Sequence, residues 1–385
     1  MTNPIGPLLP ADESLTHQIA DTFALVDTSD LSWTEKICAM AAAKDGSLQL
    51  GFGLGKYQNR NVMDGYAGVS RGVEQLTVRS SRRLAPRFDD TVVGPIRYEV
   101  VEPLRSVRFV LEPNDTQPVA FDWTFEAIVP PFMEDRTHRR NAVRVASDLV
   151  RYHQTGTAAG WVEVDGVRTE ITPEGWVSTR DHSWGTRFDV GLPPADVEQV
   201  DALAGISFRM IWSPVAMRRP DGSRYALLLH YQIATAPGFL HKTVMGGVEH
   251  PDGHMERWVD LEPALRFDLG NRRLLGGTVR ATTEDGTVRE LEIEPVSDTG
   301  FHLGAGLYFG FDGHHHGEWR GNLLVEGERI PDCADPAVAR RLHQIRDTVV
   351  HVVDPVGGGE GHGNCQPIIT GGDEELGLSA DDSFI

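Results

Sequence analysis

Apolar and polar residues alternate with a period of two along much of the chain. Alternate positions share an apolar face in two segments: Phe121, Trp123 and Phe125 within residues 119–128, and Tyr225, Leu227, Leu229 and Tyr231 within residues 224–233. Successive side chains of a β-strand point to opposite faces, so this pattern indicates strands with one face on a core and one face toward solvent.

Some fifteen segments combine strand composition with flanking turn sequences such as Asp165-Gly166. The expected strands are residues 47–54, 72–79, 97–101, 105–112, 119–128, 157–165, 173–179, 206–213, 224–233, 242–248, 255–260, 274–281, 287–294, 301–309 and 317–326. They exceed one ordinary sheet and form two series on either side of residues 184–194. The sequence therefore predicts a mostly β fold of two antiparallel β-barrel or sandwich domains packed together, with few short helices.

The chain divides into four regions on this basis. They are an N-terminal adapter segment (residues 1–45), a first β-domain (46–190), a second β-domain (191–370) and a tail (371–385). The tail is acidic and poor in apolar residues, a composition that favours disorder. One helix is expected around residues 335–347, where apolar residues recur at helical spacing.

Composition narrows the classes of function. The chain has 385 residues, of which 40% are hydrophobic and 24% charged, as in ordinary globular proteins. A formal net charge of −20 argues against a nucleic-acid partner, because phosphate binding needs a basic surface. No apolar run is long enough for stable membrane insertion. Three widely separated cysteines suit neither a disulfide framework nor a zinc site, so we expect a reducing cytoplasm.

The densest group of chemically active residues is the run from Arg180 to Arg187, which reads Arg-Asp-His-Ser-Trp-Gly-Thr-Arg. Asp181 beside His182 can fix the imidazole tautomer or raise its pKa. Trp184 offers a flat apolar wall. The residues alone leave two interpretations open: a functional site, or a structural corner in which these polar groups satisfy one another.

Together with Gly160-Trp161 and Asp165-Gly166 upstream, this run resembles the hallmark of the carotenoid 1,2-hydratase (hydroxyneurosporene synthase) superfamily. The specific similarity to the superfamily covers residues 156–187. The alternating strand pattern over most of residues 45–370 is also compatible with it. The resemblance implies two lipocalin-like domains. The superfamily includes hydratases that add water to isoprenoid double bonds, fungal Diels–Alderases and a ceramide-handling survival factor.

Carried over residue by residue, the His-x-Trp of the hydratases falls on His182 and Trp184. Their Tyr-x-Asp, whose Asp is thought to protonate the alkene, has no counterpart, because the strand around residues 208–212 carries no carboxylate. Hydration of an alkene needs a strong, positioned acid. Asp181 could supply it from another strand, as could Asp122 or Glu126.

We therefore predict Asp181, His182 and Trp184 as catalytic residues. Residues predicted to contact the ligand are Arg187, Trp123, Trp212, Tyr57 and Tyr231. Tyr57 belongs to a polar cluster at residues 55–61, which suits either a barrel mouth or a plain surface loop. Neither His314-His315-His316 nor the Gly-rich residues 357–364 has the spacing of a metal or phosphate site, so we expect a turn and a flexible closing loop there.

Two functions remain open. The first is an enzyme that needs no organic cofactor or metal and acts on a hydrophobic isoprenoid-, steroid- or polyketide-like molecule by hydration, dehydration, isomerisation or cyclisation. The alternative is a non-catalytic carrier of a lipid or another hydrophobic metabolite, which the missing Tyr-x-Asp favours. Either function has a hydrophobic small molecule as its partner and is compatible with a homodimer.

Overall fold

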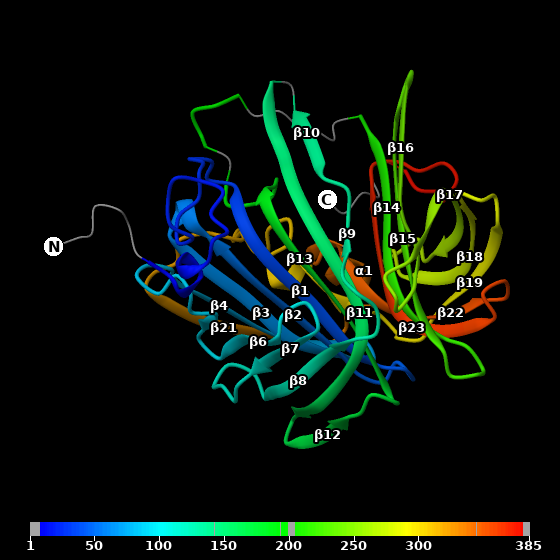
Figure 1. The fold of residues 1–385 in the computed structure, drawn as a ribbon, viewed down its shortest axis with the longest axis horizontal. Coiled ribbons are helices and arrows are strands. Elements are labelled where there is room, and N and C mark those ends of the chain that lie inside the picture. The colour runs from blue at the N-terminus through cyan, green and yellow to red at the C-terminus, as the bar shows by residue number, and fades with distance from the viewer. Residues whose placement is uncertain (1–7, 142, 193, 199–204, 344, 380–385) are drawn as a thin grey trace.

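Two large antiparallel sheets make up almost all of the computed structural model, which describes residues 8–141, 143–192, 194–198, 205–343 and 345–379 (Figure 1). Helices are few and short: the α-helix α1 (Pro336–Arg341) and the 3-10 turns η1 (Pro10–Glu13), η2 (Gln58–Arg60) and η3 (Gly304–Gly306). The predicted mostly β fold of two lipocalin-like units with few helices is confirmed. No helix of the described residues is long and apolar enough to span a membrane. The cytoplasmic location and the homodimer stay predictions.

The first sheet curls into a nearly closed barrel, called the first barrel below. Its main path runs in the order β21-β4-β3-β2-β1-β13-β11-β8-β7-β6-β5, and β9, β10 and β12 pair with β11. Its strands are β1 (Trp33–Ala43), β2 (Gln49–Tyr57), β3 (Val62–Arg71), β4 (Glu74–Arg83), β5 (Val92–Val93), β6 (Ile96–Glu102), β7 (Ser106–Leu111), β8 (Val119–Ala127), β9 (Phe132–Met133), β10 (Thr137–Asn141), β11 (Arg144–Val164), β12 (Val167–Ile171), β13 (Trp176–Thr186) and β21 (Leu323–Ile330). Strands β5 and β6 return to contact β3, which brings the two edges of the sheet together.

The second sheet runs in the order β19-β18-β17-β16-β15-β14-β23-β22-β20. Its strands are β14 (Ser207–Arg218), β15 (Arg224–Ala236), β16 (Phe239–Glu249), β17 (Met255–Phe267), β18 (Leu274–Thr283), β19 (Val288–Pro295), β20 (Phe301–His302), β22 (Arg346–Asp354) and β23 (Gly359–Thr370). An additional pairing of β19 with β22 joins the sheet to itself, so we call it the second barrel.

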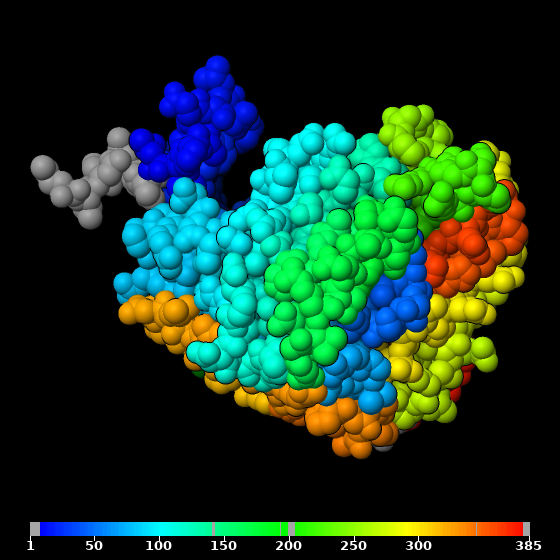
Figure 2. Space-filling model, turned by 90° about the horizontal axis from the view of Figure 1, so that it is seen from below, coloured from blue at the N-terminus to red at the C-terminus, as the bar shows by residue number. Residues whose placement is uncertain are grey.

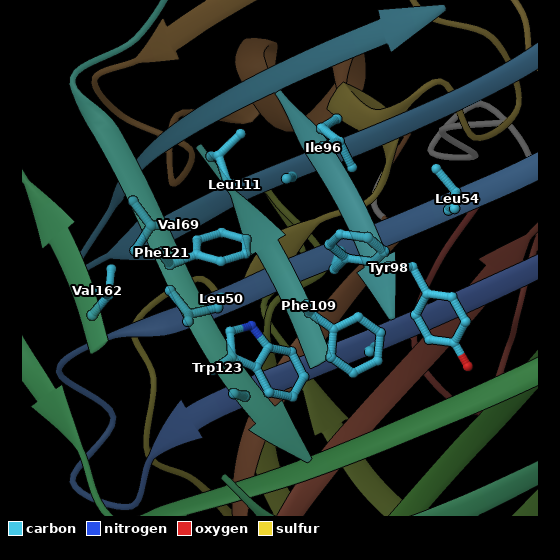
Figure 3. Packing of buried hydrophobic residues seen from close by; sticks show 14 of the residues in the cluster. Leu50, Leu54, Val69, Ile96, Tyr98, Phe109, Leu111, Phe121, Trp123 and Val162 are labelled. Carbon is cyan, nitrogen blue, oxygen red and sulfur yellow. The ribbon is translucent and has the colours of Figure 1, made fainter. Parts of the chain in front are cut away.

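Each barrel encloses its own apolar core. In the first, the inward face of β8 supplies Phe121, Trp123 and Phe125, all fully buried, as the alternation along residues 119–128 predicts. Figure 3 shows Phe121 and Trp123 within this core. The rings of Phe109 and Trp123 lie 4.3 Å apart between centroids. In the second, the alternate residues of β15 from Tyr225 to Tyr231 fill the core in the same way.

The two barrels pack against each other through β11 and β13 of the first and β14 and β23 of the second. In Figure 2 they are in direct contact, and the orange residues around β21 lie against the first barrel. The first barrel thus contains β1, from the expected adapter segment, and β21, from the second half of the chain. Sheet membership alone does not define domains, and the domain boundaries stay a prediction.

Three glycines of β2 leave room for aromatic rings that pack against this strand. Gly51, Gly53 and Gly55 alternate along β2, and a Cβ at each would collide with the rings of Phe301, Tyr66 and Tyr57, respectively. Their missing side chains leave room for these three rings, of which Phe301 belongs to β20. A strand is expected over residues 301–309, but only Phe301–His302 is one, because η3 and the positive φ angles of Leu307 and Phe309 turn the chain.

Three expectations near the C-terminus differ from the structure. The helix expected at residues 335–347 ends at Arg341, since His343 has a positive φ and β22 begins at Arg346. The Gly-rich run expected as a closing loop begins β23 at Gly359. Residues 371–379, expected to be disordered, contact the second barrel through the buried Leu378. Residues 1–7 and 380–385 of the expected terminal segments lie outside the described residues.

Candidate functional site

A cavity of about 70 Å³ lies where the two barrels meet, and we call it the inter-barrel cavity. Its walls include Cys38 and Met40 of β1, Arg151 of β11, Thr179 and Asp181 of β13, Arg187, Trp212 of β14, Leu303, Tyr308, Asp347 of β22, and Asn364 and Gln366 of β23. A buried water needs about 10–15 Å³ of such space, so the cavity holds roughly five waters or the reacting end of an organic molecule.

Thr179, Arg180 and Asp181 of β13 line this cavity, and His182 and Trp184 of the same strand do not. Asp181 points outward, toward the second barrel, and lines the cavity. His182 and Trp184 lie on the opposite face of the strand, where His182 pairs across the sheet with the core residue Ile37. The structure therefore brings Asp181 together with Arg187 and Trp212, and it separates Asp181 from His182 and Trp184.

Asp347 is an acid of the cavity whose side chain accepts hydrogen bonds from two neighbouring residues. The side-chain amides of Asn364 and Gln366 both donate a hydrogen bond to its Oδ1, each with a donor–acceptor distance of 2.9 Å. Burial raises the pKa of Asp347 to about 6; the two amides partly offset this effect, and the charge of Asp181 adds to it. Because Oδ1 accepts two hydrogen bonds, the proton of the neutral acid belongs on Oδ2.

Asp181 is the second acid and comes from the other barrel. Burial raises its pKa, although the positive charges of Arg151 and Arg187 act in the opposite direction. The Nε atom of Arg151 lies 3.7 Å from Oδ2 of Asp181. The charge of Asp181 adds to the raised pKa of Asp347, and Glu134 adds to that of Asp181. Two carboxyl groups with raised pKa values in one cavity are a common arrangement for proton transfer near neutral pH.

A buried network behind the cavity wall is centred on Glu134. The indole N–H of Trp212 donates to Oε1 of Glu134 over 3.0 Å, and Nδ1 of His153 and of His230 each lie 3.4 Å from the carboxylate. Although burial alone would raise it, Arg151, His153 and His230 hold the pKa of Glu134 well below its usual range. This network fixes the orientation of Trp212 at the cavity.

Another buried network lies behind Tyr308. Nζ of Lys36 is 2.7 Å from Nε2 of His316 and 3.8 Å from the centre of the Tyr308 ring. The Tyr308 hydroxyl contacts Sγ of Cys38 over 2.8 Å. Burial lowers the pKa of Lys36 to about 8. Both networks hold cavity residues in one orientation, as a preorganised site requires.

His182 has partners other than Asp181. Its Nε2 lies 2.9 Å from Oε1 of Glu35, and its Nδ1 lies 3.1 Å from the Tyr152 hydroxyl. The ring of Trp184 packs edge-on against His182, with 5.6 Å between centroids. Glu35 was missed by sequence reasoning because it precedes His182 by 147 residues and only the pairing of β1 with β13 brings them together.

The other predicted ligand-contacting residues lie apart from the cavity. Trp123 lies in the core of the first barrel, and Tyr231 lies in that of the second. Nζ of Lys242 lies over the Tyr231 ring, 5.5 Å from its centre. Tyr57 is fully buried against Val62 and Val190, so residues 55–61 are not a plain surface loop.

Of the three carboxylates considered as the missing acid, only Asp181 lines the inter-barrel cavity. Asp122 forms an ion pair with Arg108, and Glu126 forms one with Arg105; these pairs lie on outward-facing positions of the first barrel.

Apart from Trp212, sequence reasoning missed the second-barrel side of the cavity. Asp347 is the second residue of β22, ahead of the apolar run of that strand, and Asn364 and Gln366 follow a Gly-rich run that does not alternate in polarity. The available signal was the spacing of Asn364 and Gln366, which puts both amides on one face of a strand. Among the described residues, no three His, Cys, Asp or Glu side chains are arranged to hold a metal ion.

A model of a family of unknown function (DUF8625) matches residues 8–379. No curated protein matches the sequence. The fold is similar to that of CghA, which is 10% identical, with 95% of this chain and 94% of that chain covered and a TM-score of 0.50.

Two more solved structures are similar. They are an AttH-like protein from Nitrosomonas europaea (13% identity, 95% and 98% covered, TM-score 0.47) and kievitone hydratase from Nectria haematococca (9% identity, 90% and 91% covered, TM-score 0.42). At these identities, the similarity concerns the fold alone.

Proposed function

The chain belongs to the DUF8625 family of unknown function, and we propose that it is an enzyme that moves protons to and from an oxygenated, hydrophobic small molecule in the inter-barrel cavity. The reaction class is hydration or dehydration, isomerisation or cyclisation, without an organic cofactor. We also propose membership of the wider carotenoid 1,2-hydratase superfamily, on the run from Arg180 to Arg187.

The observation that carries this proposal is the pair of buried acids, Asp347 and Asp181, one from each barrel. Burial raises the pKa of both, that of Asp347 to about 6, so a neutral acid is available close to neutral pH. The Oδ2 proton of Asp347 is the one to be donated to a carbonyl or alkene, and Asp181 is the group that takes a proton back. Such a pair substitutes chemically for the carboxylate missing from residues 208–212.

The remaining walls have supporting roles. Arg151 and Arg187 stabilise negative charge that develops on a substrate oxygen. Trp212 and Tyr308 cover the apolar part of the molecule. His182 and Trp184, on the other face of β13, act as positioning residues, because they fix the strand that carries Asp181.

The size of the cavity limits the substrate. Sites that enclose a drug-sized ligand usually measure about 300–1,000 Å³, several times the 70 Å³ found here. A long polyene does not fit whole, whereas a small molecule or the oxygenated end of a larger one does. This favours a polyketide-like substrate over a carotenoid.

The test is native mass spectrometry and organic extraction of protein purified from a near-native host. We expect a bound molecule that the parent protein changes chemically on incubation and that Asp347→Asn and Asp181→Asn bind but leave unchanged. Asp122→Asn, a carboxylate paired with Arg108 outside the cavity, is the matched control and keeps the activity. Conversion that persists in both cavity variants contradicts the proposal.

The second candidate is a carrier without catalysis, favoured by the lack of a carboxylate in residues 208–212, where β14 instead presents Trp212 to the cavity. A carrier returns the extracted molecule unchanged from the parent protein as well as from Asp347→Asn. That result separates the two candidates in the same experiment.

A further inference from the structure

Arg151 reaches the inter-barrel cavity with a guanidinium group that no carboxylate holds closely. Its ion-pair partners, Glu134 and Asp181, both lie 3.7 Å away, which is beyond hydrogen-bond length. The Nε atom is buried and has no hydrogen-bond partner among the described residues. A donor in this position is available to a ligand in the cavity.

Arg187 adds a second donor of the same kind. Its Nη2 donates to Oγ of Ser183 over 2.8 Å, which anchors one edge of the guanidinium plane. Its Nε is also buried without a hydrogen-bond partner in the part of the chain that the structure describes. One arginine follows β13 and the other belongs to β11, so the two donors approach the cavity from separate segments.

The acidic groups nearby leave this positive charge only partly compensated. Glu134 shares its charge with His153 and His230 and with the indole N–H of Trp212. Asp181 and, beside Arg187, Asp189 are further acidic neighbours, and burial raises the pKa of both, that of Asp189 to about 7. An anion that enters the cavity favours the neutral form of Asp181 further, because like charges at short range disfavour ionisation.

We propose that the inter-barrel cavity recognises its ligand through an anionic oxygen group, a carboxylate or an enolate, held by Arg151 and Arg187. A planar guanidinium matches such a group in shape and charge. Asp347, from the second barrel, then faces the uncharged part of the ligand beside Met40 and Trp212. The ligand class is a small organic acid or acidic enol with an apolar body, which deepens the proposed function and rests on it only for the location of the site.

The test uses a matched pair of probes, trans-cinnamate and cinnamamide, which share a shape and differ in charge. Isothermal titration calorimetry of the full chain is expected to give cinnamate an affinity at least about tenfold higher, as charged hydrogen bonds provide. Arg151→Met and Arg187→Met keep the apolar stem and remove the charge. Each substitution is expected to lower the affinity for cinnamate by about tenfold or more and to leave the affinity for cinnamamide unchanged.

Arg105→Met is the matched control, because Arg105 is exposed and pairs with Glu126 on the outside of the first barrel. It is expected to keep the preference for cinnamate. The inference is overturned by equal affinities for the acid and the amide, by failure of both probes to bind at millimolar concentration, or by an equal loss in Arg105→Met.

A second measurement needs no variant and covers the case in which an arginine substitution prevents folding. Cys38 lines the cavity, whereas Cys333 and Cys365 are buried. Cinnamate is expected to slow alkylation of Cys38 by iodoacetamide several-fold, and cinnamamide much less. Equal protection by the two probes overturns the inference.

The two proposals fail separately. If Asp347→Asn abolishes conversion of the extracted molecule while cinnamate shows no preference over cinnamamide, only the anion inference falls. If cinnamate is preferred but the extracted molecule is never converted, the anion inference stands and the enzymatic function falls.

Discussion

Asp181 and His182 are neighbours in sequence and lie on opposite faces of one strand. Asp181 lines the inter-barrel cavity, and His182 hydrogen bonds to Glu35 and Tyr152 at a partly exposed position of the first barrel. A sequence motif shows that both residues are present but cannot show which face meets a second domain. This explains why the run from Arg180 to Arg187 was recognised while the role of each residue had to come from the structure.

Asp347 gives the first prediction at the scale of a residue. Its pKa is raised from 3.8 to about 6, so the folded protein binds this proton more tightly than the unfolded chain. The free energy of unfolding therefore falls as pH rises from about 4 to 6, by about 3 kcal/mol for a shift of about two pKa units.

Asp347→Asn removes this ionisation. Relative to the parent, we expect the variant to gain about 3 kcal/mol between pH 4 and pH 7, measured by urea unfolding at each pH. Asp122→Asn, which removes a carboxylate paired outside the cavity, serves as the control. A difference between Asp347→Asn and parent that stays constant with pH would show that Asp347 does not have a raised pKa.

His153 gives a prediction for the contact between elements, since it links β11 to Glu249 of β16 over 2.7 Å. Burial alone would lower its pKa, but Glu249 and Glu134 raise it to about 9 from 6.5. The stabilisation from this charge is complete below about pH 6.5 and is lost as pH rises through about 9. Its magnitude is about 3 kcal/mol.

His153→Phe should abolish this decline in unfolding free energy between pH 6.5 and 9. The matched control is His250→Phe, because His250 also pairs with a glutamate, Glu256, but at a partly exposed site. A parent protein whose stability does not fall over this range would contradict the role of His153 as a charged link between the barrels.

The strands that sequence reasoning missed share one physical property. Strand β3 is buried on both faces over nearly its whole length, and the second half of β1 is a buried, alanine-rich run. Strands covered on both faces lose the alternation of apolar and polar residues that identifies a half-exposed strand. The segment around residues 119–128 alternates, and the structure has the half-exposed strand β8 there. Strand β15, at residues 224–233, was also predicted, although it is buried on both faces from Tyr225 to Tyr231.

The glycines of β2 give a second prediction at this scale. A Cβ at Gly53 would collide with the ring of Tyr66, so Gly53→Ala should lower the free energy of unfolding by about 1–3 kcal/mol. Gly175→Ala is the control, since the only nearby atom is the flexible Oγ1 of Thr172 at 3.2 Å. Chemical denaturation measures both, and equal effects would mean that close packing on β2 is not needed.

At the scale of the molecule, the two-barrel architecture could be predicted from the sequence. Of the cavity, only Asp181, Arg187 and Trp212 were among the predicted site residues, because the rest depends on how the barrels meet. Asp181 and Asp347 are far apart in the chain and reach one cavity only when β13 of the first barrel lies near β23 of the second. The period of two within a strand carries no information on this contact. Asp347, Asn364 and Gln366 were missed for that reason.

The central claim is that the cavity between the barrels is where the ligand is bound and changed. A crystal structure of the protein with its co-purified ligand tests it most directly. The account predicts density for the ligand between the barrels, with one of its oxygen or carbon atoms within hydrogen-bond reach of Oδ2 of Asp347. A ligand bound instead inside the first barrel, beside His182 and Trp184, would contradict it.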